Sequence, residues 1–388
     1  MKVNAVARST RDRSWGDDMP AAARRSAFLT HPVFRQAGFG RHHPLSISRH
    51  AAMLDVIEAL RWLDDQERYP CPLADRDLLL RFHAVDYLDA FMRVASEGVA
   101  SAQDRERYNL GTMECPVFPG LRERALASVG GSVKAAELAL AGAVAFHPGG
   151  GTHHGRPDRA AGFCYFNDPV FAILRLLDGG LSRVVYVDLD AHHGDGVELA
   201  FAGDPRVLTL SIHEEGRFPG TGLIDDRAGG SARNLPVPRG LNDSELDFLM
   251  TEAVLPLLER FAPEGLVVTA GADCLAGDPL SAMAISNVAL WQAVDRLVAH
   301  VGVAVVLGGG GYNPWTVARG WAGLWATLAH KPMPETLPSG AHAVLEGLSC
   351  DLVDDEDRDA AWLSSIADAP NPGVIRGTIV EIARAVLA

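Results

Sequence analysis

Short apolar runs, most of them followed at once by polar or glycine-rich residues, alternate with longer helical patterns along this chain of 388 residues. The runs that we interpret as strands are 26–30, 143–146, 183–187, 206–212, 265–270 and 303–308. Several are apolar at nearly every position, which is typical of parallel strands that are buried on both faces. This alternation predicts an α/β fold with a mainly parallel β-sheet flanked by helices.

The helical patterns lie near 48–64, 131–141, 169–177, 244–260, 285–300 and 316–329. One helix start carries a capping box, because Asn242 can cap and Glu245 follows three residues later. Pro256 is expected to kink that helix or to end it early. The segments 99–120 and 214–240 are rich in glycine, proline and charge, and we predict that both are long loops.

Length and composition limit the class of protein. We expect residues 1–25 to form a loosely ordered tail and residues 26–388 to form a single domain. The formal net charge is -14, so there is no basic excess to neutralise phosphates and nucleic acid is not an expected partner. Five cysteines without a C-x-x-C pair favour a cytoplasmic location over a disulfide framework. No apolar run is long enough to predict a membrane span, and a homo-oligomer is left open.

Polar residues gather where five of the predicted strands end. HPGGGTHH follows 143–146, DLDAHHGD follows 183–187, HEEGRFPGTG follows 206–212, GADCLAGDP follows 265–270, and GGGYN follows 303–308. Ligand sites in open α/β sheets form outside the carboxyl ends of the strands. We therefore expect these loops to meet at one edge of the sheet and to form the functional site.

A metal site is predicted from the first residues after 183–187. In an extended chain Asp188, Asp190 and His192 face the same side, because alternate residues do so. Asp190 and His192 can therefore reach one ion, and Asp278 offers a third ligand from a neighbouring strand end. Three protein ligands with one open position are typical of a catalytic zinc site.

A pair of adjacent histidines, His153 and His154, lies in a glycine-rich loop at another strand end. A metal site that activates water needs a base for the proton of the water and an acid for the leaving amine, and two imidazoles can divide these tasks. Asp188 and Asp195 are the nearby carboxylates that can fix the imidazole tautomers. The alternative, in which both histidines are further metal ligands, stays open.

Further residues point to the same site. The glycine run 308–311 lets the backbone approach a ligand closely and places Tyr312 at the rim, where a phenol can donate a hydrogen bond to an oxyanion. The run does not match a nucleotide-binding fingerprint. Phe163 and Phe218 come from separate loops and can form an apolar slot for an aliphatic chain.

Taken together, the motifs GTHHG, GFCYFND, YVDLDAHHGDG, SIHEEGRFPGTG, GADCLAGDPL and LGGGGYN resemble those of the zinc-dependent histone deacetylase family. The resemblance includes the bacterial acetylpolyamine amidohydrolases and acetoin-utilisation proteins, and it extends from about residue 31 to about residue 329. It implies an arginase-like, three-layer α/β fold with the site at the carboxyl ends of the strands. It also implies a metal-dependent hydrolase that removes the acetyl group from an acetylated amine.

The resemblance assigns roles to individual positions. It implies that Asp190, His192 and Asp278 bind one Zn2+ ion, with Fe2+ as an alternative metal. His153 is paired with Asp188, His154 is the general acid–base paired with Asp195, and Tyr312 polarises the acetyl carbonyl.

Other positions acquire supporting roles from the same resemblance. Phe163, Phe218 and Gly162 line the acyl-lysine tunnel. Arg49 lies near the inner cavity from which acetate leaves, and His43 and Pro44 belong to the same motif. A structural K+ ion is implied near Asp188, Asp190, His192, Ser211 and Ile212.

The substrate and two other functions remain open from the sequence. Acetyl-lysine in protein and acetylpolyamines fit equally well, and no acidic rim residue is evident near 97–100. The acidic residues of 97–120, namely Glu97, Asp104, Glu106 and Glu114, can narrow an entrance, although charged loops are usually only solvated. The alternatives to a deacetylase are a binuclear manganese ureohydrolase and a catalytically silent acyl-binding protein. Tyr312, a tyrosine where weakly active relatives have histidine, favours an active enzyme.

Overall fold

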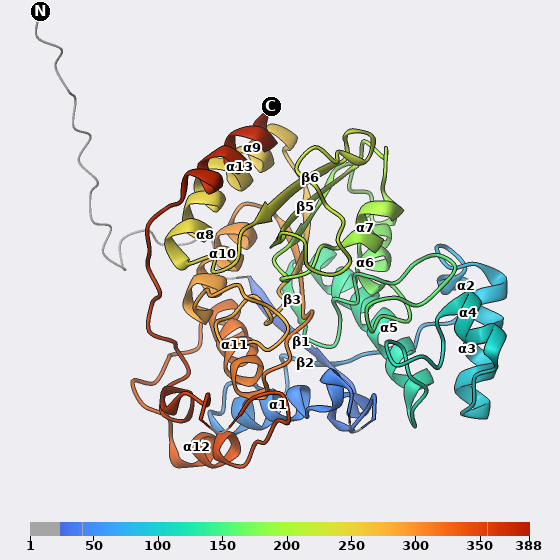
Figure 1. Cartoon of the computed structure of the whole chain (residues 1–388), viewed down its shortest axis with the longest axis horizontal. Helices are drawn as coiled ribbons and strands as arrows, with labels where there is room; N and C mark the ends of the chain where they lie inside the picture. Colours follow the sequence, from blue (N-terminus) through green and yellow to red (C-terminus); the bar gives the residue numbers. More distant parts are fainter. Residues whose placement is uncertain (1–23, 41, 355) are drawn as a thin grey trace, which may run out of the picture.

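A parallel sheet of eight strands forms the centre of the computed structural model, which describes residues 24–40, 42–354 and 356–388 (Figure 1). The strand order is β2-β1-β3-β8-β7-β4-β5-β6, and every neighbouring pair is parallel. The strands are β1 (Arg25–Thr30), β2 (Arg68–Pro70), β3 (Ala143–His147), β4 (Val184–Asp188), β5 (Val207–Glu214), β6 (Ala232–Val237), β7 (Gly265–Thr269) and β8 (Val303–Leu307). The predicted α/β fold with a parallel sheet is confirmed.

Helices cover both faces of this sheet. They are α1 (Arg49–Ala59), α2 (Arg76–Leu79), α3 (Val85–Glu97), α4 (Ala102–Tyr108), α5 (Leu121–Leu140), α6 (Asp168–Asp178), α7 (Asp195–Ala200), α8 (Asp243–Leu249), α9 (Leu255–Phe261), α10 (Asn287–Ala299), α11 (Pro314–Leu328), α12 (Ser339–Glu346) and α13 (Gly377–Leu387). Alternate strand residues face opposite layers. Val185 and Val187 of β4 pack in the same core cluster as α1, α10 and α11, whereas Val184 and Tyr186 pack in the cluster that contains α5 and α6. The result is a three-layer arrangement.

The six predicted strands and six predicted helices are all present, with shifts at their ends. The largest shift concerns α5, which begins ten residues before the predicted 131–141. The two predicted long loops are wrong in part. The segment 214–240 contains the edge strand β6, and 99–120 contains the short helix α4, which begins at a Ser101 capping box. Strand β2 has only three residues, too few to give a pattern in the sequence.

The predicted helix over 244–260 carries two local sequence signals, the Asn242–Glu245 capping box and Pro256. The Asn242–Glu245 capping box is present at the start of α8, so this prediction is confirmed. A π-helical turn, Met250–Val254, then separates α8 from α9. Pro256 lies in the first turn of α9, where a missing N–H costs little, so the helical segment is interrupted before the proline and continues to Phe261.

Some predictions lie at the margins of the described residues. Most of the tail predicted over 1–25 lies outside them, and β1 begins at Arg25. Within the described part of the chain, no helix has both the length and the apolar character needed to cross a bilayer. The predicted cytoplasmic location and the division into a tail and one domain stay predictions.

The sheet topology fixes where a site can form. Strands β3, β8, β7 and β4 are consecutive neighbours in the middle of the sheet. Because they are parallel, their carboxyl ends lie at one edge, and the loops 148–167, 308–313, 270–286 and 189–194 leave from there. These loops contain most of the residues predicted to carry the chemistry.

Candidate active site

Two carboxylates and one imidazole converge at the ends of β4 and β7. Ligand atoms of Asp190, His192 and Asp273 all lie within 4.8 Å of one another, and the three residues are buried. Nδ1 of His192 lies 2.9 Å from Oδ2 of Asp273 and 3.1 Å from Oδ1 of Asp190. The three donors therefore face a common point, as the ligands of a single cation do.

The electrostatics of this group fit a cation. Burial and the charge of Asp190 raise the pKa of Asp273 to about 6, because two carboxylates this close repel each other. Burial opposes charge on His192, but the two carboxylates raise its pKa to about 10. Buried carboxylates are costly without a positive partner, and a divalent ion between these groups would relieve the repulsion.

The third member of the group is Asp273 and not the predicted Asp278. Oδ2 of Asp278 accepts the backbone N–H of Tyr312 at 2.7 Å, and Oδ1 accepts that of Leu280 at 2.9 Å. Asp278 therefore holds the backbone that carries Tyr312. Asp273 lies nearer to the end of β7, and its Oδ1 accepts the N–H of Ala191 at 3.0 Å, which ties it to the Asp190 loop. The group of donors that the structure brings together thus contains Asp273 in place of the predicted Asp278.

The histidine pair has the predicted carboxylate partners. Nδ1 of His153 lies 2.7 Å from Oδ2 of Asp188, and Nδ1 of His154 lies 2.8 Å from Oδ1 of Asp195. The two imidazole rings are 4.0 Å apart between their centroids, and both are buried. Since each Nδ1 atom is engaged by a carboxylate, the Nε2 atoms are left for chemistry. Nε2 of His153 lies 3.8 Å from Oδ1 of Asp190, beside the metal donors.

The two imidazoles differ in basicity. Burial opposes charge on His153, but Asp188, Asp190 and Asp195 together raise its pKa to about 9. Burial and the charge of His153 lower the pKa of His154 to about 4. Adjacent residues of the same type therefore favour opposite protonation states near neutral pH.

Aromatic rings and the catalytic groups form a tunnel toward the metal donors. The ring centroid of Phe218 lies 5.1 Å from that of His154, and Phe163 lies 6.0 Å from Tyr312. Tyr312 is buried and its ring lies 6.3 Å from that of His192. Phe218 is 46% exposed, so it stands at the mouth. Both phenylalanines line one cavity together with His154, His192 and Tyr312.

Two glycines leave the space that the catalytic groups need. A Cβ atom at Gly162 would lie 2.3 Å from Cδ2 of His154, and its φ of 53° also disfavours other residues. A Cβ atom at Gly310 would lie 2.1 Å from Oδ2 of Asp273. The N–H of Gly310 donates to Oδ2 of Asp190 at 2.6 Å. The backbone itself therefore forms the inner wall of the site.

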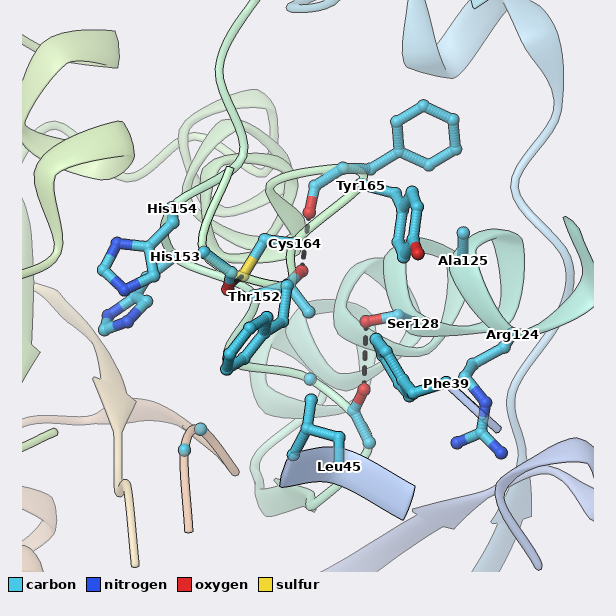
Figure 2. Close-up of a pocket in the computed structure, with 18 of the residues that line it drawn as sticks. Phe39, Leu45, Arg124, Ala125, Ser128, Thr152, His153, His154, Cys164 and Tyr165 are labelled. Carbon is cyan, nitrogen blue, oxygen red and sulfur yellow. Dashed lines mark hydrogen bonds between the residues drawn. The ribbon is translucent and has the colours of Figure 1, made fainter. Parts of the chain in front are cut away.

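An inner cavity continues from the catalytic groups away from the mouth (Figure 2). Arg49 lines it, and Nη1 of Arg49 donates to the carbonyls of Gly309 at 2.8 Å and Gly311 at 3.3 Å. His43 lies at the edge of the site, with its ring 4.4 Å from that of Phe163, and Pro44 begins the short 3-10 helix that follows it. Arg49 thus lines an inner cavity, and its predicted place where acetate leaves stays a prediction.

The residues of the predicted K+ site lie together on β4 and β5. Ser211 is the register partner of Asp188, and Ile212 follows it on β5. Oγ of Ser211 lies 2.8 Å from Nδ1 of His213. The K+ site stays a prediction.

Two residues of the site, Asp273 and Arg156, carried no usable signal in the sequence. Asp273 was hidden beside Asp278 in one motif. Arg156 follows the histidine pair closely in the sequence, and it forms an ion pair with Oδ2 of Asp195. Glu114, one of the acidic residues of 97–120 named from the sequence, accepts the N–H of Gly162 and lines the mouth.

Residues 43–328 match the histone deacetylase domain. The chain belongs to the histone deacetylase family. It is 35% identical over 320 residues to the acetoin utilization protein AcuC of Bacillus subtilis (strain 168), and the aligned segment covers 79% of this chain and 82% of AcuC. It is 34% identical over 301 residues to histone deacetylase 8 of Xenopus tropicalis, and the aligned segment covers 75% of this chain and 81% of that relative.

Solved structures agree with this membership. The crystal structure of a histone deacetylase homologue from Aquifex aeolicus matches with a TM-score of 0.89 and 33% identity, covering 94% of this chain and 100% of the homologue. A homologue complexed with SAHA matches with a TM-score of 0.88 and 32% identity over the same shares. The fold is therefore the arginase/deacetylase-like one that the sequence predicts.

Family membership decides between the open functions. This histone deacetylase family member is a hydrolytic deacetylase that acts on acetylated amines. The ureohydrolase and the silent acyl-binding alternatives are set aside. A zinc-type catalytic metal is typical of the family, and the buried group of Asp190, His192 and Asp273 fits such a site.

Proposed function

We propose that this deacetylase hydrolyses acetyl-lysine amides in peptides or proteins, with one divalent ion held by Asp190, His192 and Asp273. The observation that carries the proposal is the convergence of these three buried donors beside the histidine pair. Two carboxylates and one imidazole leave a coordination position open, as a catalytic site requires. When bound, the ion supplies Lewis-acid polarisation of the acyl carbonyl and of the attacking water.

We further propose the identity of the ions. Zn2+ suits two carboxylates and one imidazole, and Fe2+ accepts the same ligands, so the metal present in cells depends on supply as well as on the site. A K+ ion is proposed near Asp188, Asp190, His192, Ser211 and Ile212, where it would stabilise the loop that presents the catalytic donors. Metal analysis of the purified protein identifies both ions.

The protons are handled by the histidine pair. His154 has the lowered pKa, so its Nε2 atom is free to accept a proton from water and then to deliver it to the departing amine. Asp195 fixes the tautomer of His154 through Nδ1. His153, hydrogen-bonded to Asp188, keeps a positive charge beside the reacting atoms.

Tyr312 stabilises the oxyanion. Burial raises the pKa of its phenol well above the usual value, so the hydroxyl keeps its proton and can donate a hydrogen bond as negative charge develops on the acyl oxygen. Asp278 acts through Tyr312, because it holds the backbone N–H of that residue. Asp278 is therefore a positioning residue.

The shape and charge of the mouth support a polypeptide substrate. The mouth encloses about 560 Å³, and its charged lining residues are of both signs: Glu114, Glu214, Glu215, Arg217 and Arg239. A wide entrance admits the backbone on either side of a lysine. The mixed charge gives a polycation such as an acetylpolyamine little extra attraction.

The metal assignment is tested by two variants from the same loop. Asp273→Ala is expected to remove the metal and to lower acetate release by at least about a thousandfold. Asp278→Asn, the matched control, is expected to keep about one ion per chain while activity falls, because Tyr312 loses its backbone anchor. Metal content is measured by inductively coupled plasma mass spectrometry. Loss of metal from Asp278→Asn with retention in Asp273→Ala would reverse the assignment.

The substrate is tested by comparing kcat/KM for acetyl-lysine peptides with that for N-acetylputrescine and N-acetylspermidine. We expect the peptides to be preferred by at least about tenfold, which corresponds to about 1.4 kcal/mol of transition-state binding at the mouth. A preference for the acetylpolyamines would show that the small amines are the substrate class.

A further inference from the structure

The inner cavity has two unlike ends joined by apolar walls. Figure 2 shows the imidazoles of His153 and His154 on one side and the guanidinium of Arg124 on the other. Between them lie Phe39 and Leu45, which line the cavity. A chain of methylene groups that starts at the catalytic groups would meet apolar surface first and a positive charge beyond it.

Two guanidinium groups on this cavity lack a carboxylate partner within the described part of the chain. Arg124 donates through Nη2 to the carbonyls of Val33 at 2.9 Å and Gln36 at 2.6 Å, and Arg49 also donates to backbone carbonyls. Among the described residues that line the cavity, Asp190 is the only carboxylate, and it belongs to the metal group. Arg124 therefore makes the cavity positive on the side away from the histidines, and Arg49 adds a positive charge nearer to the metal donors.

The charges of the two arginines influence each other and their surroundings. Burial, together with the charge of Arg49, lowers the pKa of Arg124 to about 10, so Arg124 remains charged at neutral pH. Burial also lowers the pKa of Arg49, whereas nearby acidic groups, including Asp190 and Asp273, oppose this shift. Burial and these two charges also lower the pKa of His50 well below its usual value. An anion in the cavity would relieve this repulsion, since buried charges need partners.

The cavity is larger than an acetyl group needs. Its volume is about 80 Å³. On the same measure one water molecule needs roughly 10–15 Å³, so there is room for several heavy atoms beyond the acyl carbon. The methyl group of an acetyl group would fill only part of this space.

We propose that this enzyme also removes acyl groups that end in a carboxylate, such as succinyl, glutaryl and adipoyl, with the distal carboxylate held by Arg49 and Arg124. The reaction is the same hydrolysis: the amide C–N bond breaks, a C–O bond forms to the oxygen of water, and the amine leaves protonated. The products are a free amine and a dicarboxylate. The proposal rests on the proposed function, because it uses the same catalytic groups.

The test compares two acyl groups of equal length. Glutaryl-lysine and pentanoyl-lysine peptides both carry five carbons and differ only in the terminal carboxylate. We expect kcat/KM for glutaryl to exceed that for pentanoyl by at least about tenfold, as charge-assisted pairing with a guanidinium predicts. Succinyl and adipoyl peptides then show which chain length reaches the arginines best.

Variants of Arg124 connect the preference to the cavity. Arg124→Met is expected to abolish the preference for glutaryl over pentanoyl, and Arg124→Lys is expected to retain part of it. Acetyl-lysine hydrolysis in the same assays reports whether each variant is folded and whether the proposed function holds. Equal rates for glutaryl and pentanoyl in the wild type, or an equal loss of both in Arg124→Met, would overturn the proposal.

A binding measurement separates this inference from the proposed function and from simple retention of a product anion. Free glutarate is expected to raise the Tm of the metal-loaded protein more than pentanoate or acetate does, and less so in Arg124→Met. This result is independent of any turnover. If acetate stabilises the protein as well as glutarate does and glutaryl peptides are not cleaved, the cavity holds only the small product and the proposal is wrong.

Discussion

The two histidine–aspartate pairs of the site are alike in geometry and unlike in charge environment. The Nδ1–oxygen distances are 2.7 Å for His153–Asp188 and 2.8 Å for His154–Asp195. Asp188 accepts a further hydrogen bond from the neutral hydroxyl of Tyr186 at 2.7 Å.

Asp195, by contrast, forms an ion pair with the guanidinium of Arg156. His153 is surrounded by three carboxylates, whereas His154 depends on one carboxylate that is already paired. Burial and the number of nearby carboxylates therefore decide which imidazole can accept a proton, and the third partner of each pair acts on the carboxylate behind it.

The largest expected effect is a difference between the two imidazoles in activity. His154→Ala is expected to lower kcat/KM for an acetyl-lysine peptide by about a thousandfold, since general acid–base catalysis contributes about 10²–10⁴. His153→Ala is expected to lose roughly ten times less, because its imidazole acts by charge and position. Metal content and circular dichroism provide the controls. A larger loss in His153→Ala would exchange the two roles.

Arg156 sharpens the comparison through the pH profile. Arg156→Met removes the cation that helps to hold the pKa of Asp195 down, so Asp195 places more negative charge on His154 and the pKa of His154 rises. The acid limb of kcat/KM, which requires neutral His154, is expected to move to higher pH, and Arg156→Lys is expected to restore it in part. Activity near pH 7 is expected to change little, because a pKa that starts at about 4 leaves His154 neutral there after a modest rise. An unmoved acid limb would remove Arg156 from the proton-handling groups.

In the metal-free protein, the two histidines are expected to change the free energy of unfolding in opposite directions: His153 stabilises the fold by binding a proton, whereas protonation of His154 destabilises it. The pKa of His153 is raised from 6.5 to about 9, so its stabilisation is complete below pH 6.5 and is lost as the pH rises through 9. The pKa of His154 is lowered to about 4, so His154 destabilises the fold as the pH falls from 6.5 toward 4.

Urea unfolding at pH 6.5 and pH 9 isolates the contribution of His153. His153→Gln is expected to lose less free energy of unfolding between these pH values than the wild type, by up to about 3 kcal/mol. An identical loss in both proteins would show that His153 does not titrate in this range.

The smallest expected effect concerns Tyr186, the neutral hydrogen-bond partner of Asp188. Tyr186→Phe removes the hydrogen bonds of its hydroxyl to Asp188 and to Oγ1 of Thr269, at a cost of about 1–3 kcal/mol of unfolding free energy. Because no charge is lost, the acid limb of kcat/KM is expected to stay in place. A shift comparable to that of Arg156→Met would contradict the distinction between a neutral and a charged third partner.

Much of the fold was predictable because it depends on local patterns. The apolar runs of β3, β4, β7 and β8 are buried on both faces, and the polar residues that follow them mark the edge of the sheet where the site lies. The edge strand β6 was missed because its sequence, ARNLPV, contains a proline and polar residues and resembles a loop.

The identity of the third metal donor was not predictable because it depends on contacts between distant segments. Asp273 and Asp278 lie in one motif, and both are buried aspartates. Only the backbone of Tyr312, 34 residues further along the chain, distinguishes them, because its N–H is held by Asp278. Arg124 and Arg156 were missed for a similar reason, since an arginine in a helix or loop gives no sign of what it faces.

The glycines against His154 and Asp273 limit how this enzyme can change. A side chain at Gly162 or Gly310 would displace a catalytic group before it touched any substrate. New acyl preferences therefore have to arise from the walls further back, at positions such as Phe39, Leu45 and Arg124. Libraries that vary those positions and leave the two glycines untouched should give altered selectivity without loss of turnover.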